Sequence, residues 1–336
     1  MPTLPENPQP ASRHSLFVGL AVVIAWGLNF PLQKALLTAM QPEGFLLLRF
    51  ALMPLLVAGL LLWRYGLRWP RVSNRDAWAL ARLGLLGQGL HLGLSSYGIH
   101  FSTPFSSSVL LACGPVFTLL ILRAYGLETL QRAQLAGIAV AAAGALLFMS
   151  DKLLAADWRA GGGDAVLLLA AAMFSYYTVA AKPLIERHGA VLVMCYASLA
   201  ATLPVLIYAA PLATRVAWAA VPPLLWLGAL WAVVGIGFVT WLAWGWVNAQ
   251  RGVARTAPLI YLMPPVAGLA AWASTGEQFS LAKVLGAAIT LGGVALAQFA
   301  PQRRARQPLP SRPDTLVRPR LTESPQQQPH HDTPNH

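Results

Sequence analysis

The chain has 336 residues, of which 56% are hydrophobic and only 11% are charged, and its formal net charge is +12. A soluble domain carries about a quarter charged residues, so a water-soluble globule could not bury this much apolar surface. The composition excludes a soluble enzyme, a disordered chain and a disulfide-rich secreted domain. The two cysteines, Cys113 and Cys195, lie in apolar runs without disulfide or metal-ligand spacing. The class that remains is an all-α polytopic membrane protein.

Apolar runs long enough to cross a bilayer, which takes about 20 helical residues, follow one another along the chain. Ten spans are predicted, with nine or eleven as alternatives because the third and fourth nearly touch. The first run is not a cleaved signal peptide, because Pro31, Gln33 and Lys34 stand where small residues should be. In chain order, the predicted spans are 16–37, 44–63, 78–98, 102–123, 131–150, 164–183, 190–209, 223–247, 254–273 and 280–299.

Basic residues are divided unevenly between the two sets of predicted loops. Eleven Lys and Arg lie in loops on the side of the termini, against five in the opposite loops. Because loops rich in Lys and Arg stay inside, we predict a multi-pass protein of the cytoplasmic (inner) membrane with both termini cytoplasmic. The positive net charge is then explained by basic loops that set the orientation of the protein in the membrane, and nucleic acid is not a predicted partner. Residues 1–14 form a cytoplasmic segment, and the Pro-, Gln- and Arg-rich residues 301–336 are predicted to be a disordered cytoplasmic tail.

The chain also repeats itself at an offset of 149 residues. Four residues recur in one gapless register: Pro115, Glu128, Gly137 and Gly144 match Pro264, Glu277, Gly286 and Gly293. We predict repeats over 15–150 and 164–300, joined by an external linker at 151–163. Each repeat holds five spans, so the second enters the membrane from the opposite side. Inverted repeats that rock around a midplane site are a common plan of secondary transporters, and a duplicated scaffold without transport is the alternative.

Five stretches carry a family resemblance: AWGLNFPLQK at 25–34, PEGFLLLRF at 42–50, SSVLLACGPVFTLL at 107–120, GGDAVLLLAAAMFSYYTVAAK at 162–182 and RTAPLIYLMPPVAGL at 255–269. In this order they resemble the EamA-type proteins of the drug/metabolite transporter superfamily, over about residues 15–300. The resemblance implies ten helices, cytoplasmic termini and two inverted five-helix repeats. Characterised members mostly export amino acids and related metabolites, and others move nucleobase-like compounds or cationic drugs.

Polar groups inside a bilayer usually face the protein interior or a watery cavity, so they are the candidates for a solute path. In the first span Trp26, Asn29 and Gln33 share one helical face, and Pro31 frees a backbone carbonyl nearby. This face either meets the solute or joins helices. Arg49 in the second span either snorkels to the outer interface or attracts a solute carboxylate, which Arg binds through two hydrogen bonds.

The third and fourth spans add polar and helix-breaking candidates. Gln88, His91 and Ser95 form a stripe, in which His91 either relays protons or binds an anionic group, or is a neutral partner of a neighbouring helix. In the fourth span Ser108 either reaches the cavity or satisfies a backbone carbonyl. Pro115 is expected to kink the same span.

The second repeat adds aromatic candidates. They are Tyr176 in the sixth span, Trp241 and Trp244 in the eighth, and Tyr261 in the ninth. The two tryptophans belong either to an aromatic belt at the interface or to an apolar, cation-attracting wall. Pro264, the repeat counterpart of Pro115, and its neighbour Pro265 are the helix-breaking candidates here.

The sequence gives no support for catalysis. Gly161 to Asp164 match a Gly-x-Gly-Asp pattern of intramembrane aspartyl proteases, but no second acidic residue lies inside a predicted span, and Asp164 is expected to cap a helix. No nucleotide loop, metal-binding motif or cofactor motif is present, so no cofactor is predicted and any pumping must use a gradient.

The leading prediction is a secondary transporter of small organic solutes that works by alternating access, with an amino-acid or related metabolite exporter favoured. Efflux of multiple drugs or aromatic cations is the alternative, disfavoured because no carboxylate lies in mid-membrane. A membrane enzyme or non-transporting scaffold is a third possibility. The predicted partners are a small solute, the bilayer and, if His91 relays them, protons; uniport stays open, and the sequence indicates no oligomeric state.

Overall fold

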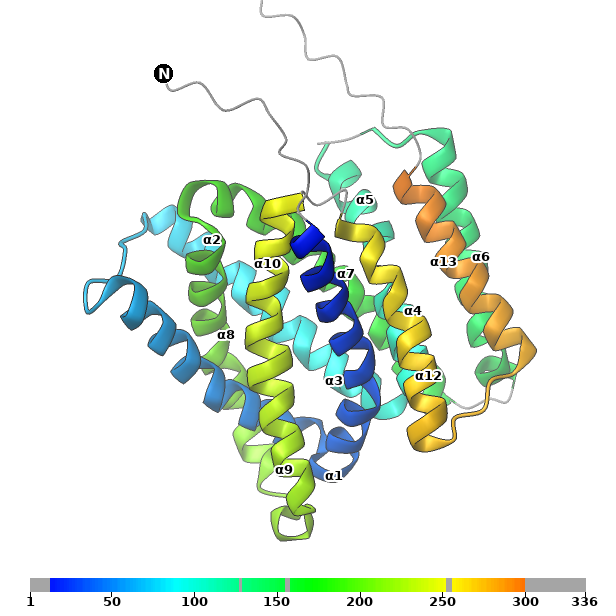
Figure 1. Ribbon diagram of the computed structural model, residues 1–336, viewed down its shortest axis with the longest axis horizontal. Coiled ribbons are helices and arrows are strands. Elements are labelled where there is room, and N and C mark those ends of the chain that lie inside the picture. The colour runs from blue at the N-terminus through cyan, green and yellow to red at the C-terminus, as the bar shows by residue number, and fades with distance from the viewer. Residues whose placement is uncertain (1–12, 127–128, 155–157, 252–255, 300–336) are drawn as a thin grey trace, which may run out of the picture. The chain divides into compact units, whose positions relative to one another are not determined.

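The computed structural model describes residues 13–126, 129–154, 158–251 and 256–299, and every regular element within these ranges is a helix (Figure 1). Seven helices in this part of the chain are long and apolar enough to cross a membrane. The protein is therefore an all-helical, multi-pass membrane protein. These seven are Arg13–Tyr65, Pro104–Ala124, Arg132–Ser150, Gly161–His188, Ala190–Ala213, Pro223–Val247 and Leu281–Phe299, and a shorter apolar helix spans Leu259–Thr275.

Several of these helices are interrupted, so the elements are more numerous than the spans. In chain order they are α1 (Arg13–Tyr65), α2 (Asn74–Gly84), the π-helix η1 (Leu85–Leu90), α3 (His91–Phe101), α4 (Pro104–Leu111), α5 (Gly114–Ala124), α6 (Arg132–Leu154), α7 (Trp158–His188), α8 (Ala190–Ala213), the short η2 (Trp218–Ala220), α9 (Pro223–Leu230), the π-helix η3 (Trp231–Val239), α10 (Thr240–Arg251), the 3₁₀ helix η4 (Ala257–Leu262), α12 (Met263–Thr275) and α13 (Leu281–Phe299).

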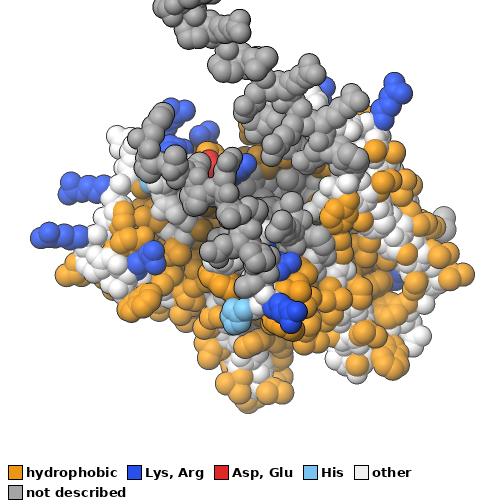
Figure 2. Space-filling view, turned by 45° about the horizontal axis from the view of Figure 1, so that its top comes forward, with side chains coloured by type: hydrophobic (Ala, Val, Ile, Leu, Met, Phe, Trp, Pro, Cys, Tyr) orange, Lys and Arg blue, Asp and Glu red, His pale blue; other side chains and the backbone are white. Residues whose placement is uncertain are grey.

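The outer surface is largely apolar. Figure 2 shows hydrophobic side chains over much of the described face, with Lys and Arg projecting mainly at its margins. Leu55, Leu203 and Leu269 are each about two-thirds exposed. Such a surface is stable against lipid, where exposed leucines cost nothing.

The long helix α1 consists of two limbs that run in different directions (Figure 1). The limbs meet at Gln41, the only non-glycine residue with a positive φ in the described chain, at φ 57° and ψ 160°. Pro42 follows, and a residue before proline is disfavoured in the α conformation. The predicted spans 16–37 and 44–63 lie one in each limb.

Two proline positions coincide with helix breaks. The chain turns between the end of α4 and Gly114, and Pro115 lies in the first turn of α5. Pro264 likewise lies in the first turn of α12, after the 3₁₀ helix η4. Proline suits the first turn of a helix because the missing N–H would have no partner there. Pro265 follows in α12, whereas Pro31 lies within a stretch of α1 that remains helical.

Helices α6 and α13 lie side by side (Figure 1) and are held by glycines of the sequence repeat. A Cβ atom on Gly137 would lie 2.4 Å from the backbone N of Ala297, and one on Gly286 would lie 2.4 Å from the backbone N of Phe148. Phe148 and Ala297 are themselves 149 residues apart, so these are one contact made twice. Glu128 lies outside the described residues, as do residues 1–12 and the predicted tail.

The region predicted as a linker is more helical than expected. Helix α6 continues to Leu154 and α7 already begins at Trp158. Asp164 is therefore not at a helix start, and the expectation that it caps one is wrong. It is fully buried inside α7 and accepts a hydrogen bond from the hydroxyl of Ser102.

Candidate functional site

A cavity of about 570 Å³ lies among helices contributed by both sequence repeats. This volume is within the range of pockets that hold metabolite-sized ligands. Its wall is mainly apolar, with a few polar side chains. The residues that line it are Trp26, Asn29, Phe30, Gln33, Arg49, His91, Leu92, Ser95, Ile99, Leu111, Gly114, Pro115, Thr118, Leu119, Leu122, Ala171, Phe174, Ser175, Thr178, Ile236, Trp241, Trp244, Ile260, Met263, Gln298 and Phe299.

The structure brings many of the sequence-predicted residues to this cavity and leaves others away from it. On the wall are Trp26, Asn29, Gln33, Arg49, His91, Ser95, Pro115, Trp241 and Trp244. The candidates not on the described wall are Gln88, Ser108, Tyr176, Tyr261, Pro31, Pro264 and Pro265.

Three of the residues away from the wall have definite partners. Ser108 is fully buried and its hydroxyl donates to the carbonyl of Phe105 at 2.7 Å. Tyr261 donates to the side chain of Gln298, which does line the cavity. Gln88 Oε1 accepts from the hydroxyl of Ser198 at 2.7 Å, and Gln88 lines a second, smaller pocket next to the cavity.

The first limb of α1 contributes the face that its periodicity predicts. Trp26 Nε1 donates to Thr240 Oγ1 at 2.7 Å, which ties this face to α10 of the second repeat. Asn29 Nδ2 donates to Gln33 Oε1 at 3.0 Å. The other end of the Asn29 amide, Oδ1, is buried without a partner in the described structure. The face thus both joins helices and offers a buried acceptor to the cavity.

His91 is fixed by a hydrogen bond to α7. Its Nδ1 lies 2.8 Å from the carbonyl oxygen of Ala170, and because a carbonyl can only accept, Nδ1 carries the hydrogen. In the neutral ring Nε2 is then an acceptor. The ring packs against Phe174 at 5.2 Å between centroids. One turn along α3, the Ser95 hydroxyl is buried and has no partner among the described residues.

Aromatic side chains from three helices form much of the remaining wall. Phe174 packs edge-on against Trp241 at 5.8 Å, and Trp26 packs against Trp244 at 5.2 Å. Tyr177 also contacts Trp241, at 6.0 Å. Trp241 and Trp244 therefore both pack within the helix bundle against partners from other helices. Such a wall suits the apolar body of an organic molecule.

Arg49 is buried at the junction of the cavity and the smaller pocket, with only 7% of its surface exposed. This burial excludes the snorkelling interpretation. Its Nε has no hydrogen-bond partner, and no described residue of the cavity wall is Asp or Glu. Nor do the described His, Cys, Asp and Glu side chains form any group of three that could hold a metal ion.

The helix that runs from Asn74 to Phe101 belongs to the first repeat, and polar contacts connect each of its two ends to the second repeat. At its start, Asp76 accepts from Arg187 at 2.6 Å and from His188 at 2.8 Å. The hydrogen bond from His188, followed by the charge of Arg187, holds the pKa of Asp76 below its ordinary value.

Beyond Phe101, at the opposite end, the contacts involve the start of α4. Besides the Ser102–Asp164 bond, Glu277 accepts from the backbone N of Phe105 at 3.3 Å and from Lys283 at 2.8 Å. Lys283 also donates to Thr103 at 3.3 Å. The two repeats are thus connected by polar contacts on either side of the cavity.

Several wall residues are not among the sequence-predicted candidates, although the sequence carries a signal for some of them. Phe174, Ser175 and Thr178 lie on one face of α7, at the spacing expected for a helix. Starting from Thr178, steps of three and four residues back along the helix select Ser175 and Phe174 and pass over Tyr176. Thr118 and Gln298 carry no such signal, because each is a single polar residue in an apolar run.

A cavity walled by both repeats of a multi-pass helical protein is the arrangement expected of a small-molecule carrier. The chain belongs to the EamA-like transporter family, whose profile matches residues 14–150 and again residues 161–299. The expected resemblance is thereby confirmed.

Known relatives agree with this assignment. A protein of Streptantibioticus cattleyicolor, named a probable terminal-alkyne amino-acid exporter, is 29% identical over 287 residues, covering 82% of this chain and 90% of the relative. A Salmonella typhimurium protein, named a probable amino-acid metabolite efflux pump, is 27% identical over 306 residues, covering 86% and 96%. One crystal structure superposes with a TM-score of 0.55 at 19% identity, covering 85% of this chain and 97% of its own, which supports the fold alone.

Proposed function

We propose that this protein is a secondary transporter that exports amino acids or related metabolites across the cytoplasmic membrane by alternating access. The observation that carries the proposal is the cavity of about 570 Å³, walled by both repeats and bearing partnerless polar atoms on Asn29, Arg49 and Ser95. Buried polar groups without partners are costly, so they favour a site that a polar solute or water fills. The names of the two relatives support the solute class.

Ten spans in two inverted five-helix repeats are proposed for this carrier. The two limbs of α1, the continuous helix from Asn74 to Phe101 and the shorter helix Leu259–Thr275 would supply the spans beyond those counted by length alone. The repeated α6–α13 contact supports the inversion, since antiparallel helices that exchange equivalent contacts are related by an axis perpendicular to them. With basic loops inside, both termini would be cytoplasmic.

In this topology the structure corresponds to the inward-facing state. The cavity wall reaches Leu122 and Phe299 in the last turns of α5 and α13, which would lie at the cytoplasmic side. The opposite end would be closed by the Ser102–Asp164 and Glu277–Phe105 contacts. Reaching the outward-facing state would require these two contacts to break while the contacts of Asp76 hold.

Counterflow tests the proposal directly. Purified protein in liposomes loaded with an unlabelled amino acid should accumulate the labelled amino acid transiently and saturably, whereas empty liposomes should not. A panel of amino acids in which no member gives saturable counterflow would overturn the function.

Topology is tested separately with a C-terminal reporter that is active only outside the cytoplasm. The reporter should be silent, and a strong signal would contradict the proposed orientation.

A further inference from the structure

Arg49 is a permanent positive charge that the described structure leaves unpaired. The guanidinium is always ionised in proteins, and burying an unpaired charge costs free energy. The ion pairs of the described chain involve Asp76 with Arg187 and His188, and Glu277 with Lys283, but not Arg49. An arginine kept in this condition requires water or an exchangeable anion as its partner.

Arg49 also occupies a special position between the repeats. Its Nη2 lies 3.1 Å from where a Cβ atom of Gly237 would be. The repeat counterparts of these residues, at the same offset of 149, are Ser198 and Gln88, and Ser198 Oγ donates to Gln88 Oε1 at 2.7 Å. The two contacts are therefore equivalent in the repeat, as expected of residues that lie near an axis relating the two halves.

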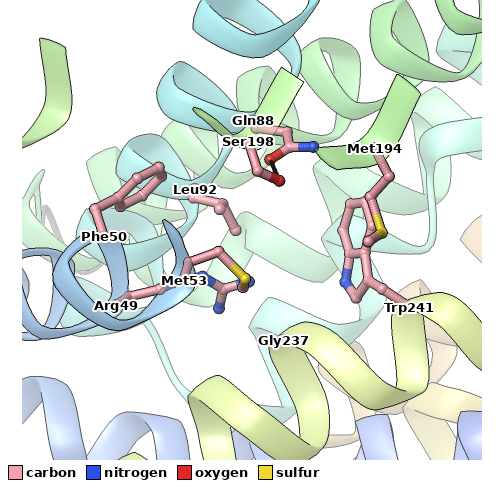
Figure 3. A pocket seen from close by; sticks show the side chains of 9 residues that line it. All are labelled: Arg49, Phe50, Met53, Gln88, Leu92, Met194, Ser198, Gly237 and Trp241. Carbon is pink, nitrogen blue, oxygen red and sulfur yellow. Dashed lines mark hydrogen bonds between the residues drawn. The ribbon is translucent and has the colours of Figure 1, made fainter. Parts of the chain in front are cut away.

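The four residues line one small pocket of about 20 Å³, enough for roughly one water molecule. Figure 3 shows the side chain of Arg49 reaching from α1 into this pocket. The hydrogen-bonded pair Gln88 and Ser198 lies across the pocket from Arg49, and the ring of Trp241 forms a further wall. In one repeat the polar pair is complete. In the other, glycine stands where glutamine would be, so the guanidinium faces bare backbone of η3. A residue near the axis is reachable from both sides of the membrane in turn, as a carrier's binding group must be.

The surroundings specify the kind of anion. Arg49, Leu92 and Trp241 line both the small pocket and the large cavity. The only other titratable side chain on the described wall is His91, and none is acidic. A single guanidinium matches a carboxylate, and the apolar and aromatic wall beside it matches a hydrocarbon body. An ammonium group finds no counter-ion there and is repelled by Arg49.

We propose that Arg49 binds the carboxylate of the transported solute, and that the carrier selects amphipathic carboxylates without requiring their amino group. The inference rests on the transport function proposed above and narrows its substrate class. It predicts that blocking the amine of an amino acid preserves binding, whereas converting its carboxylate to an amide abolishes it.

The test is competition in counterflow with matched probes. The probes are phenylalanine, N-acetylphenylalanine, phenylalaninamide and phenethylamine, together with leucine and leucinamide. Both free amino acids and N-acetylphenylalanine should compete, and the amides and the amine should be weaker by about tenfold or more, as expected for loss of a charge-assisted hydrogen bond. Arg49→Gln should remove this preference for carboxylates, Arg49→Lys should keep part of it, and Arg68→Gln, which removes a charge at an exposed position, should keep all of it.

Two further measurements separate a solute-binding Arg49 from a structural one. Without solute, Arg49→Gln should melt at the same temperature as the parent or higher, because a buried unpaired charge is removed. Gly237→Ala, which keeps the charge but crowds Nη2, should weaken carboxylate competition and leave amide competition unchanged.

The outcomes are distinct. Amides that compete as well as carboxylates would overturn the inference while leaving transport intact. The inference would also be overturned if Arg49→Gln melted at a lower temperature than the parent and weakened competition by every probe by the same factor. An absence of counterflow with every probe would instead overturn the proposed function, and the inference with it.

Discussion

Gly144 and Gly293 make the same contact from opposite halves of the protein. A Cβ atom on Gly144 would lie 2.4 Å from the backbone N of Thr290, and one on Gly293 would lie 2.3 Å from the backbone N of Ala141. Ala141 and Thr290 are again 149 residues apart. Because both neighbours are backbone atoms, neither glycine can accept a side chain unless the helices separate.

The first prediction concerns this interface. Gly293→Ala should destabilise the protein by about 1–3 kcal/mol, the usual cost of overpacking, and lower the melting temperature in detergent. Gly292→Ala is the matched control, since a Cβ atom there meets nothing within 4 Å. It should melt at or above the parent temperature because alanine favours helix. Equal melting of the two variants would contradict the close packing of α6 and α13.

The second prediction separates the two nitrogens of His91. His91→Asn can retain a donor near the position of Nδ1 and should keep most of the stability. His91→Ala removes the bond to Ala170 and should lose about 0.5–1.5 kcal/mol. Both remove Nε2, so flux per folded molecule should fall by about 2- to 12-fold in each, measured as counterflow normalised to folded protein. Full flux in His91→Asn would show that the ring is only a structural partner of α7.

Proton coupling is read from the same variants. Flux of the parent and of His91→Asn is measured between about pH 5 and 8, where a histidine changes charge. If His91 carries the coupled proton, the parent profile should slope and the variant profile should be flat. A pH profile that slopes in both the parent and His91→Asn would mean that another group carries the coupled proton.

The third prediction concerns acid stability at the end of the bundle that contains Asp76. The pKa of this carboxyl is lowered in the folded protein by His188 first and also by Arg187. Its contribution to stability is therefore complete above the unfolded value of about 3.9 and is lost as pH falls through the lowered pKa. The parent should melt higher than Asp76→Asn near neutral pH, and the difference should shrink below about pH 4.

The control for this measurement is Glu186→Gln, which removes an exposed carboxylate from the same helix as His188. It should change melting little at neutral pH. A melting difference between the parent and Asp76→Asn that persists unchanged under acid conditions would mean that shape, rather than the charge of Asp76, supports this contact.

The fourth prediction concerns the opposite end. Glu277→Gln removes the charge that accepts hydrogen bonds from Phe105 N and Lys283 Nζ. The contact between the repeats is weakened, so this end should open more often. A cysteine introduced at Ile99, which is 2% exposed and lines the cavity, should then react faster with a membrane-impermeant thiol reagent added outside. The same cysteine without Glu277→Gln, and the parent with its two buried cysteines, are the controls. Equal labelling rates would show that Glu277 does not hold this end closed.

Periodicity in the sequence was sufficient for features that depend on one helix. The face of Trp26, Asn29 and Gln33 follows from helical spacing, and the helix breaks beside Pro115 and Pro264 follow from proline chemistry. The long apolar runs likewise indicate a multi-pass helical protein. Each of these features is local, so it can be derived from a few neighbouring residues.

Features that depend on packing between helices could not be derived in this way. Tyr261 was predicted to line the path, but it turns to Gln298, which no local pattern marks. The burial of Arg49 depends on η3 lying against it with a glycine at 237, and the sequence near Arg49 does not contain that information. The prediction of Asp164 as a helix cap is wrong because its helix begins at Trp158, six residues before the predicted start.

The α6–α13 interface suits a chain that arose from two copies of one five-helix unit. Its contacts are unchanged when the two halves are exchanged, so two identical five-helix chains inserted in opposite orientations would satisfy the same interface. A duplication followed by fusion could thus preserve a working assembly at each stage. Within a single chain each half is free to differ, and the arginine at 49 opposite the serine at 198 is a difference that no assembly of two identical chains can possess.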